Sequence, residues 1–585
     1  MTHHRRLVRS NALSARLRIT VALMSLVAMI LAACAQPGAN TPAAEEPAAA
    51  SSGGEAANAG ESSATAELPA DADETQVLRI NSGSTGSASF AFFPMEGGSD
   101  NQSWMPFMYV PPMYFDVDLN LQPGVFESWS NNEDYTEWVF KIDPRAIWSD
   151  GTPITASDVK LTWELMALPD SVMGRIVQYI GGVEGFEAYR NAEAEEISGL
   201  VVVDDATIQV NLVNPNPIFH WNIATTHMNP IKASLAVDAL DTFWLPENNP
   251  VFSGPYMLDT YDPDLQEATL VPNPNWWMDE GPYLERIELR FAPDPETLAV
   301  MLQNDQVDAS LSGLPLTLKE QFPDYFRPIK TFGFNVFWIA VTNEPTSDPN
   351  VRRALTLAVD QEAVAQAMYP EPEADIIITN QIIDPDLPCQ DTENSWYPYD
   401  PEGAKAALAA SEYGSAENLP LLRVTPRGTN AQTNRGLEAV LEFWRQNLGI
   451  TNVEFQQQVD GFGEDEALIN VSRDDVVIRF PDATTYMYVA AHSAGGIASA
   501  DGDMLRGYNN PEVDSLIEQA LALPADDPQR CELTLQAQQL YMEDNPTILM
   551  AKPTGTINAR EYVANYEKGP DVGVIAPWRI YIKQH

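Results

Sequence analysis

The feature that most constrains the fold is an alternation of strand patterns with helix-start signals, which runs from about residue 76 onward. Short apolar runs with period-two alternation, such as residues 137–142, predict half-buried strands. Asp348-Pro349, Asp400-Pro401 and Asn510-Pro511 each place a capping side chain before a proline, which is typical of the first turn of a helix. Because both kinds of element recur along the chain, the sequence predicts a mixed α/β fold.

Length and charge limit the architecture and the partners. A chain of 585 residues exceeds what one hydrophobic core of about 250–300 residues can organise, so we expect two or three lobes. The chain has 83 Asp and Glu against 33 Lys and Arg, a formal net charge of −50. Such a surface repels nucleic acid and anionic lipid, so neither is expected as a direct partner. The hydrophobic fraction of 44% excludes a largely disordered polyanion.

The N-terminus has the pattern of an export signal. Five arginines between Arg5 and Arg18 precede an apolar run from Ile19 to Ala33, and no acid comes before Glu45. This run has about 15 residues, fewer than the roughly 20 that a membrane-spanning helix needs. The ending Leu31-Ala32-Ala33-Cys34 resembles the lipobox of bacterial lipoproteins, in which the signal is cut before the cysteine and its sulfur carries a lipid.

The N-terminal pattern predicts a tethered protein. We expect residues 1–33 to be a signal peptide, and residues 34–74 to be a lipidated Cys34 followed by a flexible linker rich in Ala, Gly, Ser, Pro and Glu. The predicted location is the outer face of the bacterial cytoplasmic membrane, in the periplasm or at the cell surface. An ordinary signal peptide with a chance cysteine is the alternative.

Two cysteines remain once Cys34 is assigned to lipid. Cys389 and Cys531 form an even pair in an oxidising compartment, where a disulfide is possible. Two unpaired buried cysteines are the alternative, because a bridge needs Cα atoms within about 7 Å and the sequence does not give that distance.

Residues 146–164 carry a longer motif. By themselves they predict a tight Asp150-Gly151 turn and a helix capped by Thr155, with Asp158 completing a capping box. The whole run resembles the signature of the family 5 extracellular solute-binding proteins, the oligopeptide, dipeptide and nickel-binding components of ABC importers. Further blocks resemble the family in the same order: Leu121 to Gly124 with Glu127 to Trp129, Ser253 to Tyr256, Asn273 to Trp277, Gln306 to Ala309, Asp348 to Asp360, Tyr399 to Pro401, Tyr508 to Asp514, and Tyr581 to His585.

The resemblance implies a particular architecture. It is an α/β, periplasmic-binding-protein-like fold of the large class C (type II) kind, with two lobes joined by a hinge and an extra domain. Lobe I would comprise residues 75–118, 245–334 and 545–585, the extra domain residues 119–244, and lobe II residues 335–544. The solute would bind between the lobes, which close over it before the protein docks on the ABC permease subunits.

The resemblance also points to a ligand site near Arg479. Peptide binders of the family hold the peptide's ammonium with an Asp in an Ala-Asp-Tyr-x-x-Pro block, and the matching stretch here places Arg479 at that Asp. A guanidinium repels an ammonium, so Arg479 suits a carboxylate, phosphate or sugar hydroxyl. Asp482 is expected to neutralise Arg479 or take over part of the contact, and Tyr486 is a further candidate contact. A structural Arg479–Asp482 pair facing away from the cleft is the alternative.

Aromatic and small polar residues complete the predicted site. Phe334, Phe337 and Trp338 fall where the family chain crosses between lobes, and Phe334 and Trp338 share one face if this is a strand. Stacking of a ring on a flat solute contributes about 0.5–1.5 kcal/mol beyond burial; core packing is the alternative. Ser84, Thr85 and Gly86 follow the first predicted strand, where small residues let backbone groups approach a ligand, unless they form a plain turn.

The sequence predicts no metal, cofactor or catalytic residue. His220, His227, His492 and His585 lack ligand spacing with cysteine or carboxylate partners, and phosphate-loop and nucleophile-elbow patterns are absent from the sequence. The resulting prediction is a monomeric solute-binding lipoprotein that is not an enzyme and that carries a peptide. An oligosaccharide is the alternative solute. An exported glycoside hydrolase, with two carboxyls about 5–9.5 Å apart, is the alternative class.

Overall fold

A computed structural model describes residues 67–81, 104–169, 176–237 and 242–585. The last range has gaps at 263, 266, 293, 312–313, 315–317, 330–331, 333, 371–375, 380, 392–395, 426–430, 456–470, 477–479, 496–506 and 570–573. All described residues belong to the unit Ser63–His585. The predicted signal peptide, Cys34 and most of the predicted linker lie outside the described residues.

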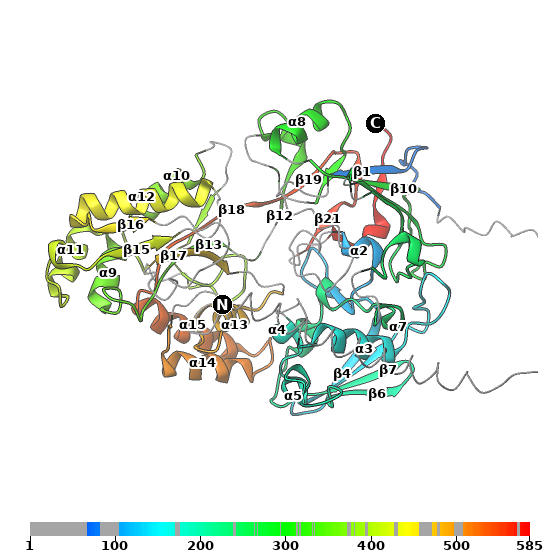
Figure 1. Ribbon diagram of the computed structural model, residues 1–585, viewed down its shortest axis with the longest axis horizontal. Coiled ribbons are helices and arrows are strands. Elements are labelled where there is room, and N and C mark those ends of the chain that lie inside the picture. Colours follow the sequence, from blue (N-terminus) through cyan, green and yellow to red (C-terminus); the bar gives the residue numbers. More distant parts are fainter. Residues whose placement is uncertain are drawn as a thin grey trace, which may run out of the picture. The chain divides into compact units, whose positions relative to one another are not determined.

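The first sheet has seven strands and combines parallel with antiparallel pairs (Figure 1). Its order is β12 (Phe326–Ile329), β19 (Gly555–Ala559), β11 (Ala309–Ser310), β1 (Val77–Asn81), β10 (Arg286–Arg290), β9 (Glu267–Pro272) and β8 (Tyr256–Asp262). β1 runs parallel to both β10 and β11, and α8 (Pro295–Gln303) connects these two neighbours. Asp294 caps α8 by accepting a hydrogen bond from the backbone N–H of Thr297.

A four-stranded antiparallel sheet lies within residues 119–244, the predicted extra domain. Its order is β4 (Phe126–Asn131), β5 (Glu137–Ile142), β7 (Thr207–Asn211) and β6 (Leu200–Asp204). Thr155 and Asp158 form the predicted capping box at the start of α3 (Ala156–Met166). Trp138 of this sheet and Leu289 of the seven-stranded sheet belong to one continuous buried cluster, so the extra domain shares its core with the first sheet.

The third large sheet has six strands and helices on both faces (Figure 1). Its order is β14 (Ile376–Ile378), β18 (Thr547–Pro553), β13 (Phe334–Ile339), β17 (Val471–Val476), β15 (Leu422–Thr425) and β16 (Val453–Phe455). One face is covered by α9 (Pro349–Leu357), α10 (Gln361–Met368), α11 (Pro401–Ala410) and α12 (Ala431–Leu448). The other is covered by α13 (Ala483–Ala491), α14 (Pro511–Leu521) and α15 (Pro528–Glu543).

Shorter elements connect or cover the sheets. The helices are α2 (Met105–Met108), α4 (Ile176–Ile180), α5 (Phe186–Arg190), α6 (Phe219–Asn222) and α7 (Ala233–Ala236). Three two-stranded ribbons pair β2 (Met113–Phe115) with β3 (Leu121–Pro123), β20 (Val563–Ala564) with β23 (Tyr581–Ile582), and β21 (Glu567–Lys568) with β22 (Val574–Ile575).

The chain passes between the seven- and six-stranded sheets twice, and both boundaries correct the predicted domains. β13 begins at Phe334 in the six-stranded sheet, although residue 334 was assigned to lobe I. β18 also belongs to the six-stranded sheet, although residues 545–585 were assigned to lobe I. The sheet changes at Thr554, between Pro553 and Gly555. Pro553 and Gly555 mark a break at this point, but such residues do not indicate that the next strand joins a different sheet.

The predicted helix starts are confirmed. Asp348, Asp400 and Asn510 cap α9, α11 and α14, with proline in the first turn of each helix. Asp527 followed by Pro528 starts α15 in the same way, although the sequence analysis did not identify it. This device works through neighbouring residues only, which is why the sequence shows it.

A disulfide joins Cys389 to Cys531, with Cα atoms 5.4 Å apart. Cys531 lies on α15, and a second bond ties the same two segments together, because the Gln538 side chain of α15 accepts a hydrogen bond from Ile383 N–H at 3.0 Å. The segment from residue 381 to 391 is therefore held against α15 by covalent and polar contacts.

Candidate ligand-binding site

The carboxyl ends of parallel strands in the seven-stranded sheet form one candidate surface. β1, β10 and β11 end together at Asn81, Arg290 and Ser310. The buried Asn81 side chain ties these ends together: it donates to Ser310 Oγ at 3.1 Å and accepts from Ala292 N–H at 3.1 Å. In α/β sheets ligands bind outside the carboxyl ends of the strands, so this edge is a natural place for a site.

The six-stranded sheet presents a corresponding edge. β15 runs parallel to β16 and β17, and the last residue of β17, Val476, pairs with Phe334 at the start of β13. β18 runs antiparallel to β13 and therefore also ends there. The chain enters this sheet at Phe334 and leaves it after Pro553, so both connections meet the carboxyl edge.

Both connections also meet the carboxyl edge of the seven-stranded sheet. β12 pairs with β19, and Ile329 lies opposite Gly555. In the direction in which β1 runs, this pair lies beyond Ser310. The connection after Ile329 and the connection before Gly555 therefore leave the sheet on its carboxyl side. Both sheets thus turn the carboxyl ends of their parallel strands toward the same two connections.

A pocket of about 260 Å³ lies at these connections. Pro328 and Ile329 of β12 line it on one side, Ile377 of β14 on the other, and Thr554 and Asp386 complete it. Residues from both sheets therefore form its wall, as expected for a site whose shape changes when the sheets move relative to one another.

A buried ion cluster supports this pocket. Lys552 Nζ of β18 lies 2.8 Å from Asp384 Oδ1 and 2.6 Å from Asp386 Oδ2. The side chains of Lys552 and Asp384 are 3% and 0% exposed, whereas that of Asp386 is 22% exposed. Buried ions need such partners, because an ammonium or carboxylate removed from water alone is strongly destabilised. Lys552 thus orients Asp386, the charged residue that lines the pocket.

Three aromatic residues of the predicted site are packed into cores instead. Phe337 is 1% exposed among helices α9 to α12, and Trp338 is 1% exposed on the opposite face of β13. Tyr486 is 0% exposed in the same cluster as Trp338. None of these three side chains is open to a solute in this structure, and their contact with the ligand stays a prediction. The reason is that β13 is an interior strand with helices on both faces, so neither face is open.

Asp482 also has a structural role, which the sequence did not predict, in a pair with Arg530. Its carboxylate caps α13 by accepting from the backbone N–H of Thr485 at 2.8 Å, and it pairs with Arg530 of α15 at 2.8 Å. Asp482 and Arg530 side chains are 7% and 3% exposed, so Asp482 is not open to a solute. Arg479, Ser84, Thr85 and Gly86 lie outside the described residues, and Phe334 is described only as the first residue of β13.

The structure also identifies charged residues near the candidate site that the sequence did not predict. Asp386 and Lys552 lie at the pocket between the connections, and Arg327 and Lys568 lie near the carboxyl edge of the seven-stranded sheet. Desolvation lowers the pKa of Arg327 and lowers that of Lys568 to about 8. In sequence these residues are scattered among ordinary surface-type charges, so no local pattern distinguishes them.

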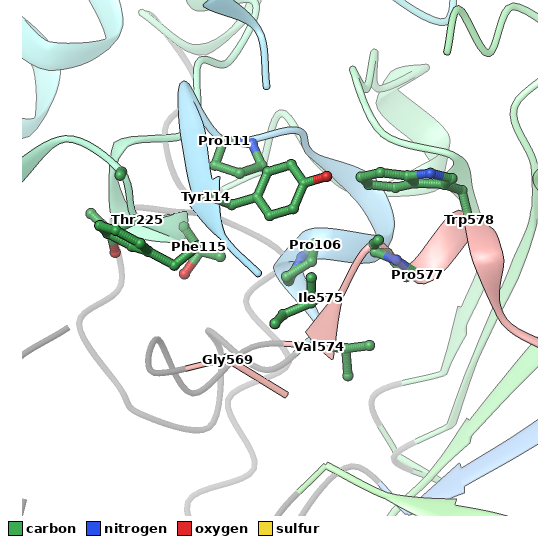
Figure 2. Close-up of a pocket in the computed structure, with 13 residues that line it drawn as sticks. Pro106, Pro111, Tyr114, Phe115, Thr225, Gly569, Val574, Ile575, Pro577 and Trp578 are labelled. Atoms are coloured by element: carbon green, nitrogen blue, oxygen red, sulfur yellow. The ribbon is translucent and has the colours of Figure 1, made fainter. Parts of the chain in front are cut away.

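A second, smaller pocket of about 40 Å³ lies wholly within the predicted lobe I and extra domain (Figure 2). Tyr114 and Phe115 line it from β2, and Ile575, Pro577 and Trp578 line it from the C-terminal segment. The Tyr114 and Trp578 rings meet edge to face, with centroids 6.0 Å apart. The volume accommodates a small apolar group or a few waters, far less than a peptide.

The described residues contain neither a candidate membrane-spanning helix nor a candidate metal cluster. No helix in this part of the chain combines the length and hydropathy needed to cross a membrane. Within the same residues, no group of three or more His, Cys, Asp or Glu side chains is arranged to hold a metal ion.

The fold and sequence match known binding proteins. The model of the middle region of the bacterial extracellular solute-binding proteins, family 5, matches residues 120–497. The periplasmic oligopeptide-binding protein OppA of Salmonella typhimurium is 24% identical over 497 residues, covering 80% of this chain and 86% of that protein. The dipeptide-binding protein DppE of Bacillus subtilis is 24% identical over 463 residues, covering 77% of this chain and 82% of that protein.

A solved structure shows the same fold. The crystal structure of Haemophilus influenzae OppA in complex with the peptide RPPGFSPFR has a TM-score of 0.67 at 21% sequence identity, covering 88% of this chain and 100% of that one. Its match confirms the predicted α/β periplasmic-binding-protein fold. Since the family model matches more than half of the chain, this protein belongs to the bacterial extracellular solute-binding proteins of family 5, the binding components of ABC importers.

Proposed function

We propose that this protein captures a peptide where the two connections join the carboxyl edges of its large sheets, and delivers it to an ABC permease. The observation that carries the proposal is the pocket at Ile329, Asp386 and Thr554, to which both sheets contribute. The relatives named for oligopeptide and dipeptide binding supply the chemical class of the solute. The protein acts by binding and release, without turnover of the solute.

Capture works through hinge closure. The sheets are joined after Ile329 and at Thr554, so a rotation about these short connections moves one set of carboxyl ends toward the other. A peptide that contacts both edges binds the closed form better than the open form, and this difference in affinity drives closure. Closure also gives the permease a way to distinguish loaded from empty protein.

Lipid at Cys34 keeps the binding protein near its permease. In this proposal the signal peptide is removed, Cys34 carries the lipid anchor, and residues 35–74 form a flexible linker. Dispersed negative charge keeps the body off an anionic membrane surface.

Ligand-dependent unfolding tests the cargo. The purified chain is heated with pools of two- to five-residue peptides, with a pool of oligosaccharides, and alone. A ligand present at 100 times its dissociation constant stabilises the folded state by about 2.7 kcal/mol, enough to raise Tm measurably. A Tm rise with peptides alone supports the proposal, whereas a rise with oligosaccharides alone replaces peptide by sugar. Mass spectrometry of the recovered ligand checks turnover, and cleaved products would overturn the assignment as a binding protein.

Complementation tests the anchor and delivery together. Cells lacking this chain are supplied with wild-type protein or with Cys34→Ser, and uptake of a captured labelled peptide is measured. We expect wild type to restore uptake and Cys34→Ser to leave the membrane fraction. Membrane association that is unchanged by Cys34→Ser would refute the lipid anchor, and uptake that does not depend on the protein would refute delivery.

A further inference from the structure

Lys568 of β21 is a partly buried cation held by a backbone carbonyl. Its side chain is largely shielded from water, and its ammonium donates a hydrogen bond to the backbone carbonyl of Leu311. Among the described residues no carboxylate lies within ion-pair distance of this ammonium. Burial without a compensating acid lowers its pKa to about 8.

Two fully buried cations have acids, whereas Arg352, which is also buried, donates to the backbone carbonyls of Asp544, Thr346 and Ser347. Lys552 pairs with Asp384 and Asp386, and Arg530 pairs with Asp482. Carboxylates are abundant, at 83 Asp and Glu against 33 Lys and Arg. A shielded ammonium without an acid costs folding free energy, since it gives up water for a single carbonyl. Such a group is a candidate for binding a partner from outside the chain when it also lies at an expected ligand-binding surface.

The position of Lys568 identifies the surface on which that partner would arrive. Leu311 directly follows β11, and its N–H donates to the carbonyl of Asn81, the last residue of β1, at 3.0 Å. Lys568 therefore places its charge at the carboxyl edge of the parallel strands. The neighbouring residue Tyr566 fixes this arrangement, because its hydroxyl donates to the Ser310 carbonyl at 3.2 Å.

Arg327 places a second cation close to the same segment. Its Nη2 donates to the Tyr566 carbonyl at 3.3 Å, and its buried Nε has no hydrogen-bond partner among the described residues. Exposed Glu567 offsets part of this charge but forms no ion pair with Arg327 in the described structure. The two cations therefore lie close to Tyr566, in a protein whose formal net charge is −50.

We propose that Lys568 is an anion-recognition residue of the ligand site, that it takes a carboxylate of the bound peptide, and that Arg327 strengthens the local positive field. The assignment rests on the proposed peptide function. An ammonium that already holds one carbonyl keeps two N–H groups for a carboxylate, and hydrogen bonds between charged groups are the stronger ones. The carboxylate supplies a counter-charge that the described residues do not place within ion-pair distance of Lys568.

Peptide capture with matched acid and amide pools tests the assignment. A library of two- to five-residue peptides is prepared once as free acids and once as C-terminal amides, and peptides retained by wild type and by Lys568→Met are quantified by mass spectrometry. We expect wild type to prefer free acids by about tenfold or more, the scale of one charge-assisted hydrogen bond. We expect Lys568→Met to lose that preference and Lys568→Arg to keep part of it.

The outcomes separate this assignment from the function on which it rests. Equal retention of both pools by wild type regardless of Asp or Glu content, or an unchanged preference in Lys568→Met, overturns the role of Lys568 and leaves peptide binding intact. Retention of neither pool overturns peptide binding and this assignment with it. If wild type retains amides that contain Asp or Glu and Lys568→Met does not, the carboxylate comes from a side chain, which supports the assignment.

Stability without ligand distinguishes a binding residue from a structural one. Lys568→Met removes an uncompensated charge, so we expect its Tm to equal or exceed that of wild type. Lys552→Met removes the partner of buried Asp384 and of partly exposed Asp386, so its Tm should fall. Lys405→Met, on an exposed side chain of α11, is the control that should change neither Tm nor capture. A fall in Tm for Lys568→Met as large as that for Lys552→Met would make Lys568 structural and overturn the proposal.

Discussion

Replacement of Arg530 by methionine should destabilise the six-stranded part of the protein more than any exposed ion-pair substitution. Arg530 joins three helices: it lies on α15, pairs with the carboxylate of Asp482 that caps α13, and bonds the carbonyls at the end of α14. Its Nη1 donates to Ala520 O at 2.8 Å and to Leu523 O at 2.6 Å. Methionine fills similar volume but leaves the carbonyls and the carboxylate without these donors.

The expected magnitude follows from burial. The side chains of Arg530 and Asp482 are 3% and 7% exposed, so removing one charge leaves the other buried and uncompensated. Breaking a buried ion pair costs about 3–5 kcal/mol. The matched control is Arg445→Met, which removes an ion pair to Glu442 of similar length from the surface of α12, where solvent screening leaves little to lose.

A double-mutant cycle with Asp482→Asn tests the pairing itself. Asparagine still caps a helix, so this change removes the charge and retains the cap. Unfolding in urea is followed transition by transition, because a chain with several sheets need not unfold in one step. Hydrogen exchange of α13 to α15 identifies the relevant transition. The double variant should lose less free energy of unfolding than the sum of the losses in the two single variants. The difference should be up to about 3 kcal/mol. Strict additivity, or a loss for Arg530→Met no larger than for Arg445→Met, would refute the reasoning.

Two further predictions concern the same region. Replacing both Cys389 and Cys531 by serine removes a disulfide between residues 142 apart. The free energy of unfolding should fall by about 2–4 kcal/mol, and peptide specificity should not change. Unchanged urea and thermal midpoints would contradict this prediction. Trp338→Ala should lower the free energy of unfolding by about 3–5 kcal/mol, because it leaves a cavity in the core. Calorimetry should find near-normal peptide affinity in the folded fraction. A selective loss of affinity would instead place Trp338 in the ligand site.

The sequence was informative where the relevant physics is local. The caps at Asp348, Asp400 and Asn510 and the capping box at Thr155 form between residues at most three apart, so their pattern is visible in the chain and the structure confirms it. The motif at residues 146–164, with the further blocks that follow the family in the same order, predicted the family and the fold class. The family match and the solved relatives confirm both.

The candidate site was less predictable because its features depend on distant neighbours. Asp482 was expected at the ligand, yet its partner Arg530 lies 48 residues away and reaches it only through the arrangement of α13 and α15. Trp338 and Tyr486 looked like binding aromatics, yet helices packed on one face of β13 bury both. Aromatic residues suit a core and a ligand site equally well, and burial alone separates the two.

The sequence by itself determined the class of elements, the helix starts, the signal-like N-terminus and the family, because each rests on residue types at short spacing. Tertiary structure decided which strands share a sheet, where the chain changes sheet at Thr554, and which charges are paired. Lys552 and Lys568 show the difference: both come from the last part of the chain, but among the described residues Lys552 meets two carboxylates whereas Lys568 meets a backbone carbonyl. That distinction exists only in three dimensions, because the partner of a buried charge is set by the fold rather than by its neighbours in sequence.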